Sequence, residues 1–197
     1  MKTLAVTSFA VAVAASVAFA TGGVSTLSEH QRNTLTTIDT IPTRDLLNDV
    51  FDGAALAKLS SIAQDKDIDI GVRVRAIHGL VNYCPDPCSD SELAHQSLTT
   101  LIGSLITTNE TLGEPIILLR ASIETLGALK VKADANLLKD LLDHPSRDIR
   151  AATARALRDL CNNQAVIPLR VRYASETTDQ VKLAISEALR ILGQCGG

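Results

Sequence analysis

IRAATARALRDL, residues 149–160, carries apolar or small side chains at a spacing that fits one side of an α-helix. Relative to Leu157, these residues stand eight, four and one positions before it and three positions after it. Such positions form a single stripe on a helix with 3.6 residues per turn. The stripe consists of Ile149, Thr153, Ala156, Leu157 and Leu160. The segment is therefore predicted to be a helix that buries one side.

Three other segments repeat this pattern in register: VRVRAIHGLVNY from Val72, LLRASIETLGAL from Leu118 and VKLAISEALRIL from Val181. The reference leucines of the four segments, called the column leucines below, are Leu80, Leu126, Leu157 and Leu189. They are separated by 46, 31 and 32 residues. A pattern that returns at such intervals predicts a repeat protein.

A further helical pattern precedes each segment, over residues 53–64, 92–107, 134–144 and 165–175, and polar turns join the two helices of a pair. One pair cannot cover its own apolar stripe, so neighbouring pairs must stack to exclude water. The sequence thus predicts an all-α fold, an α-solenoid of about four helix pairs over residues 43–197.

DHPSRDIRAATARALRDL, residues 143–160, resembles a HEAT repeat. Asp and Pro close the first helix, the basic Arg150 follows the β-branched Ile149, and an Ala-rich second helix comes next. Residues 176–193 are similar, whereas the second unit departs from the family's pattern by having Leu119 where the others have Arg or Lys. The resemblance implies a right-handed solenoid with its second helices on the concave face. It implies little about function, because such arrays serve many roles.

The N-terminal residues 1–20 have the pattern of a secretory signal peptide, with Lys2, an apolar stretch and a small-x-small site at Ala18-Phe19-Ala20. The alternative is an uncleaved membrane anchor, but the stretch is rich in Ala and contains Thr and Ser. We predict cleavage after Ala20 and export to the periplasm or the exterior. No later apolar run is long enough to span a bilayer, so no stable membrane insertion is expected after cleavage.

Residues 21–42 are rich in Thr, Ser and Gly and show no steady apolar period. This composition predicts a mobile leader before the repeat domain. The domain is expected to begin with Thr43 as the cap of a helix.

The charge balance of the chain is mixed, with 19 Lys and Arg against 22 Asp and Glu. This balance argues against nucleic acid as a partner, because such proteins carry a basic patch. Aromatic residues make up only 3% of the chain, so the core must be built from Leu, Ile, Val and Ala. That composition suits closely packed helices.

The four cysteines of an exported chain predict two disulfides, for which three connectivities exist. We favour Cys84–Cys88 as a small ring at a helix end and Cys161–Cys195 as a bridge that pins the C-terminal residues over the last unit. Zinc binding by the first pair would need two further ligands. A thioredoxin-like motif would have two residues between its cysteines rather than three. No metal is predicted.

Three aspartates, Asp65, Asp67 and Asp69, are spaced like the start of a calcium loop. An EF-hand loop counted from Asp65 would need Gly at its sixth position and an acid at its twelfth, where this chain has Ile70 and Ala76. The aspartates are therefore predicted to form a polar turn between two helices.

No catalytic motif stands out in the sequence. We find no Gly-rich phosphate loop, nucleophile elbow or metalloprotease helix, and the four histidines lack ligand spacing. We predict no catalytic residue and no cofactor, and the chain is not expected to be an enzyme.

The remaining candidate site is the side of the second helices that faces away from the apolar stripe. Its mixed charges suit a protein or peptide partner, although ordinary solvated helix residues would look the same. The predicted partner-binding residues are Arg120, Glu124, Arg155, Arg158, Glu187 and Arg190. Arg150 and Lys182 are instead expected to lean inward and pair with acids of a neighbouring unit.

Our leading hypothesis is a non-catalytic exported scaffold that binds a protein or peptide. One alternative is an enzyme of the bilin lyase type, because some of those enzymes contain short repeats that these units resemble. Another is a purely structural envelope protein that associates with itself.

Overall fold

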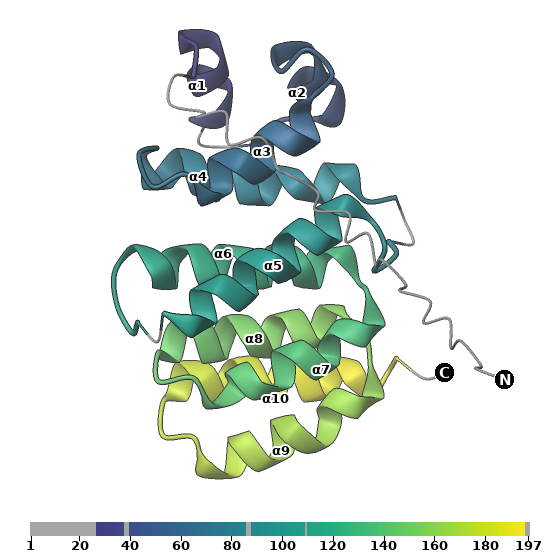
Figure 1. The fold of residues 1–197 in the computed structure, drawn as a ribbon. Coiled ribbons are helices and arrows are strands. Elements are labelled where there is room, and N and C mark those ends of the chain that lie inside the picture. Colours follow the sequence, from purple (N-terminus) through teal and green to yellow (C-terminus); the bar gives the residue numbers. More distant parts are fainter. Residues whose placement is uncertain (1–26, 38–39, 86–87, 109, 196–197) are drawn as a thin grey trace, which may run out of the picture.

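The computed structural model describes residues 27–37, 40–85, 88–108 and 110–195, and every regular element in those ranges is a helix (Figure 1). From residue 55 onward the helices form four consecutive pairs. The pairs are α3 (Ala55–Gln64) with α4 (Ile70–Gly79), α5 (Leu93–Thr107) with α6 (Glu114–Leu129), α7 (Ala135–Leu138) plus the 3-10 helix η3 (Lys139–Asp143) with α8 (Arg147–Asp159), and α9 (Val166–Ser175) with α10 (Asp179–Leu192). The all-α, α-solenoid prediction is confirmed.

Shorter elements connect or extend these pairs: the 3-10 helices η1 (Leu80–Tyr83), η2 (Lys132–Asp134) and η4 (Asn163–Ala165). The single helix predicted over residues 134–144 is instead divided into α7 and η3.

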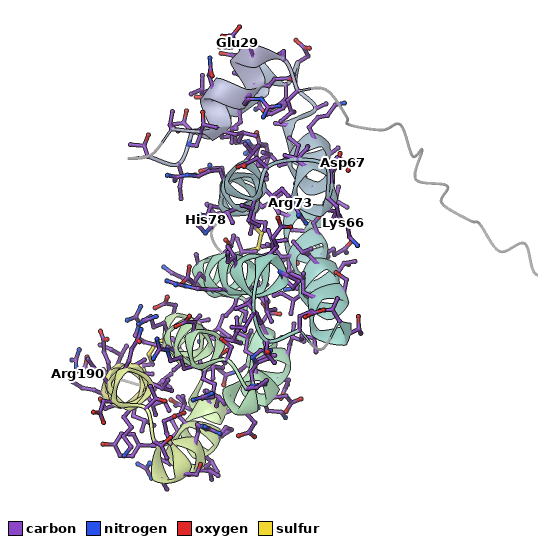
Figure 2. The ribbon with its side chains drawn as sticks, turned by 90° about the vertical axis from the view of Figure 1, so that its left-hand side faces the viewer. Glu29, Lys66, Asp67, Arg73, His78 and Arg190 are labelled. Carbon is purple, nitrogen blue, oxygen red and sulfur yellow. A yellow bond between two sulfur atoms is a disulfide. The ribbon has the colours of Figure 1, made fainter. Side chains whose placement is uncertain are left out.

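The second helices α4, α6, α8 and α10 stack in that order, with the first helices on their other side (Figures 1 and 2). Figure 2 shows His78 of α4 and Arg190 of α10 on one side of the stack, and Lys66 and Asp67 of the α3–α4 turn on the opposite side. The stack bends toward the side of the second helices, so these helices line its concave face.

The apolar stripe that the sequence pattern predicts forms the core. The residues eight positions before the column leucines are all buried: Val72, Leu118, Ile149 and Val181. Among the column leucines, Leu80, Leu126 and Leu157 are also buried, while Leu189 on α10 is only partly so. Burial against neighbouring units is what stabilises helices of this kind, because each helix alone leaves its stripe exposed.

Two of the three aspartates use their carboxylates within the α3–α4 turn, in agreement with the predicted polar turn. The carboxylate of Asp69 caps α4 by accepting a hydrogen bond of 2.8 Å from the backbone N–H of Gly71. The carboxylate of Asp65 accepts one of 3.0 Å from the N–H of Asp67. A carboxylate at the N-terminus of a helix also interacts favourably with the helix dipole.

Two buried arginines each form an ion pair with the following unit: Arg73 joins the first unit to the second, and Arg150 joins the third to the fourth. The Arg150 guanidinium binds both carboxylate oxygens of Glu176, at 2.8 and 2.9 Å, and donates to the carbonyl oxygens of His144 and Pro145. Arg172 binds Glu176 as well. The hydrogen bond from Arg150 holds the pKa of Glu176 far below its ordinary value. The predicted pairing of Arg150 with a neighbouring acid is confirmed.

Arg73 occupies the corresponding position on α4 and bonds to Glu114 at 3.3 Å. The two ion pairs differ in exposure, because the Glu114 side chain is 61% exposed whereas the Glu176 side chain is fully buried. Lys182, the third residue of this series, has no ion pair or side-chain hydrogen bond within the described ranges.

Two short helices precede the four pairs: α1 (Glu29–Leu35) and α2 (Arg44–Val50). Thr43 caps α2 as predicted, through a hydrogen bond from the N–H of Leu46. The mobile leader predicted over residues 21–42 is wrong for residues 29–35, which form α1 and bury Leu35 completely in the core. The predicted signal peptide, residues 1–20, and the start of the leader lie outside the described residues.

Two disulfides join the cysteine pairs that the sequence favoured. Cys84 and Cys88, directly after η1, have their Cα atoms 5.2 Å apart. Cys161 follows α8 and Cys195 follows α10, and their Cα atoms are 5.6 Å apart. The longer bridge therefore connects the ends of two stacked second helices. None of the helices within the described ranges combines the length and apolarity needed to cross a bilayer.

Candidate functional site

The predicted binding residues lie on three consecutive second helices, where all six are at least partly exposed. Arg120 and Glu124 belong to α6, Arg155 and Arg158 to α8, and the remaining two to α10. We call this surface the second-helix face, formed by Arg120, Glu124, Arg155, Arg158, Glu187 and Arg190 together with His78 of α4.

Four of these residues neutralise one another in two ion pairs. Arg120 Nε donates to Glu124 Oε1 over 2.9 Å, one turn along α6. Arg158 Nη1 donates to Glu187 Oε1 over 3.2 Å, and this bond joins α8 to α10. Exposed pairs of this kind contribute little to stability, but they leave no net charge to attract a partner.

Arg155 and Arg190 differ from the paired residues. Within the described ranges, neither makes an ion pair or a side-chain hydrogen bond. Arg155 stands two positions before its column leucine and Arg190 stands one position after, so both belong to the same face of neighbouring helices. They are the positive charges on this face that remain available to a carboxylate.

A pocket of about 290 Å³ opens on this face where α4 meets α6, and we call it the α4–α6 pocket. Its apolar walls are Val74, Ile116, Ile117 and Ala121. Its polar residues are His78, Arg120, Glu124 and Asp148. The sequence predicts some of these residues on the face but not the pocket itself. The available signal was that Ile117 is a large apolar residue outside the predicted stripe, and the structure leaves it 49% exposed.

His78 contributes a polar side chain to this pocket. Burial lowers its pKa below the ordinary value, and the nearby Glu124 carboxylate opposes that shift. Burial thus favours the neutral imidazole, in which one ring nitrogen can donate and the other can accept a hydrogen bond.

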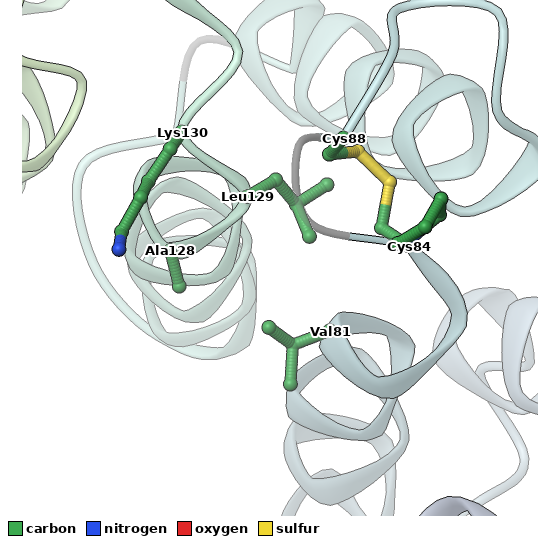
Figure 3. A pocket seen from close by; sticks show the side chains of 7 residues that line it. Val81, Cys84, Cys88, Ala128, Leu129 and Lys130 are labelled. Carbon is green, nitrogen blue, oxygen red and sulfur yellow. A yellow bond between two sulfur atoms is a disulfide. The ribbon is translucent and has the colours of Figure 1, made fainter.

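A smaller pocket of about 160 Å³ lies elsewhere along the same interface (Figure 3). Val81 and the Cys84–Cys88 disulfide face Ala128, Leu129 and Lys130 across it. Both pockets are thus found between the first and second units, beside the junction where the column leucines are 46 residues apart.

The interface between α6 and α8 is closed instead. A Cβ atom at Gly127 would lie 2.7 Å from the Cα of Ala156, so the two backbones meet here and only glycine fits. Gly127 stands one position after its column leucine, where the first unit has Val81. The same repeat position is therefore a glycine at the closed interface and, in the first unit, a valine that lines the smaller pocket.

A buried polar cluster between α5 and η2 has a structural role. His95 Nε2 lies 2.9 Å from Asp134 Oδ1, and His95 Nδ1 lies 3.1 Å from the carbonyl oxygen of Asp90. Burial raises the pKa of Asp134, and the hydrogen bond to His95 opposes that shift. Both ring nitrogens are occupied, so the cluster fastens α5 to η2. No three metal-ligating side chains converge in the part of the chain that the structure describes.

Comparison with known proteins supports the repeat assignment. Residues 113–190 match a protein-family model described as HEAT repeats. The matched stretch runs from the start of α6 into α10 and includes the closed interface between α6 and α8. A search of curated proteins finds no match to the chain. Residues 113–190 therefore have the character of HEAT repeats.

Proposed function

We propose that this protein is an exported, non-catalytic scaffold that binds another protein or a peptide through its second-helix face. The observation that carries the proposal is that Arg155 and Arg190, on the face that also contains the α4–α6 pocket, have no ion-pair partner among the described residues. HEAT repeats commonly serve as protein-interaction scaffolds, which supports the same conclusion.

The non-catalytic part of the proposal rests on how the reactive side chains are used. All four cysteines of the chain are joined in disulfides, and both ring nitrogens of His95 are bonded within the protein. His78 lies at the pocket beside an arginine–glutamate pair rather than beside a nucleophile. Such a constellation favours binding over chemistry.

Export is supported by two independent features. The pattern of residues 1–20 is typical of a signal peptide, and two disulfides are typical of an oxidising compartment. Mass spectrometry of the secreted or periplasmic protein tests this part of the proposal. The expected mass corresponds to a chain that begins at Thr21 with both disulfides formed. A cell-associated chain that retains residues 1–20 would contradict it.

Site-specific photo-crosslinking tests the binding surface. A photoreactive residue replaces Leu183 in one variant and Lys66, on the opposite side of the stack, in the other (Figure 2). Leu183 is 70% exposed and stands about two helical turns before Arg190 on α10, so this substitution labels the second-helix face and leaves its arginines in place. After irradiation in the exported fraction of the source cells, a discrete product is expected from position 183 and not from position 66. Products from position 66 alone, or from neither position, would remove the second-helix face as the binding surface.

A further inference from the structure

We infer that the partner segment is a short extended acidic peptide, which seats one apolar side chain in the α4–α6 pocket and places carboxylates on Arg155 and Arg190. This inference rests on the proposed function and specifies the partner that the second-helix face would take.

The residues that line the α4–α6 pocket favour an apolar side chain as the anchor of the peptide. Ile117 and Val74 stand at its walls, and Ile117 leaves half of its side chain in contact with water. An apolar side chain that covers these groups removes their surface from water, which is favourable in proportion to the area. The charged pair at the rim, Arg120 and Glu124, is internally neutral at a distance of 2.9 Å. A negatively charged anchor would therefore lose its hydration beside the carboxylates of Glu124 and Asp148, while the Arg120 guanidinium is already engaged.

Arg155 and Arg190 favour carboxylates in the rest of the peptide segment, because neither has an ion-pair partner within the described ranges. A guanidinium binds a carboxylate through two parallel hydrogen bonds, which are stronger than bonds between neutral groups. Glu187, the acid nearest to them in the repeat pattern, is already engaged by Arg158. A basic partner segment would meet Arg155 and Arg190 as like charges and would be repelled.

The spacing of the helices sets the spacing of the peptide residues. Packed helices lie 8–10 Å apart, so α8 is about 14 Å from a pocket located between α4 and α6. An extended chain advances about 3.3 Å per residue, which places the first carboxylate about four residues from the anchor. Arg190, on the next helix, lies about 10 Å further, or about three more residues. A helical segment would need about sixteen residues for the same span.

Fluorescence anisotropy with synthetic peptides tests this geometry. The probe is a dye-labelled peptide of eight residues, with Leu first, Glu at the fifth and eighth positions, and Gly or Ser elsewhere. Matched controls replace Leu by Ser, replace both Glu by Gln, or move the first Glu two positions toward Leu. We expect each control to bind at least tenfold more weakly than the probe, and binding of the probe to weaken as salt is added.

Variants of the protein connect the binding to the named residues. Arg155→Gln and Ile117→Ser are expected to weaken binding of the probe at least tenfold, whereas Lys66→Gln on the opposite side leaves it unchanged. Because Ile117 is exposed, and Arg155 is partly exposed and makes no ion pair within the described ranges, circular dichroism of both variants is expected to match wild type. Equal binding by wild type and both variants, or binding only by a longer helical peptide with the same side chains, would overturn the inference.

The two proposals fail in different ways. If no peptide binds while position 183 still crosslinks to a partner, the peptide specification is wrong and the scaffold proposal stands. If the probe binds but position 183 yields no crosslink in the exported fraction, the peptide specification stands and the proposed cellular role does not.

Discussion

The interface between α6 and α8 is closed, and the interface between α4 and α6 is open. In the closed interface Gly127 allows backbone contact with Ala156. In the open one, Val81 occupies the equivalent position, and two pockets remain between the helices. The difference shows how a repeat protein combines two requirements. Regular units supply stability through close packing, while an irregular junction leaves surface that a partner can cover.

The first prediction tests the stacked stripe, on which both interfaces depend. Leu157→Asp places a charge at a fully buried position and is expected to cost at least several kcal/mol, because no partner can neutralise it there. Leu183→Asp is the matched control on the neighbouring helix, where the leucine is 70% exposed, and its effect is expected to stay within about 0.5 kcal/mol. Urea unfolding measures both. Similar stabilities of the two variants would show that the register is wrong.

The second prediction compares the two arginine–glutamate pairs. Glu176→Gln breaks a fully buried pair and is expected to destabilise the protein by about 3 kcal/mol, because two arginines lose a charged partner. Glu114→Gln removes an exposed partner of Arg73 and is expected to cost less than about 1 kcal/mol. Thermal unfolding at neutral pH distinguishes these values. Equal losses of stability in the two variants would mean that burial does not determine how much each ion pair contributes.

Acid titration sharpens the same comparison. Because the pKa of Glu176 is lowered in the folded protein, its contribution to stability is present above its ordinary pKa of 4.5 and is lost as the pH falls below that value. Wild type should therefore lose stability more steeply below pH 4.5 than Glu176→Gln does. Parallel stability curves for the two proteins would contradict the assignment.

The third prediction tests the closed interface through glycine. Gly127→Ala forces α6 away from α8 and is expected to cost about 1–3 kcal/mol. Gly103 lies inside α5, where an added methyl group would have no atom within 4 Å, so Gly103→Ala is expected to stabilise by about 0.5–1 kcal/mol. Chemical denaturation measures the change in the free energy of unfolding for both variants. Changes of opposite sign would support close packing at Gly127 and not at Gly103. A stabilising Gly127→Ala would show that this interface is not closed.

The smallest expected effect concerns two buried threonines on the helices of the closed interface. Thr125 donates to the carbonyl oxygen of Ala121 over 2.8 Å, while the Thr153 hydroxyl has no hydrogen-bond partner among the described residues. Thr153→Val is expected to stabilise by about 1 kcal/mol, and Thr125→Val to destabilise by a similar amount. The two melting temperatures should move in opposite directions, and a shared direction would contradict the assigned bonding.

Much of the fold could be predicted from the sequence because it follows from local periodicity. The stripe through Leu126 and Leu157 depends only on positions within one helix, and the structure buries it as expected. The helix α1 could have been predicted too, since Ser28 and Gln31 form a capping box at its start. The Thr- and Ser-rich composition around it concealed that signal.

The site was harder to predict, because its shape depends on contacts between units. The sequence placed Arg155 and Arg190 on an exposed face, but not the fact that they alone among the four arginines of that face remain unpaired within the described ranges. The α4–α6 pocket depends on how Val74 and Ile117 meet across two helices, and the smaller pocket on how Val81 faces Ala128 and Leu129. The interval of 46 residues indicated an irregular junction without showing which residues would line it.

The contrast between the two interfaces can be measured directly with methyl NMR and a soluble gadolinium chelate, which broadens resonances of exposed groups. The methyl groups of Val74 and Ile117, in the open interface, are expected to broaden strongly. Those of Ile123 and Ala156, which are 0% and 2% exposed beside the closed interface, are expected to remain sharp. Equal protection of all four, or broadening at Ala156 but not at Ile117, would contradict the account.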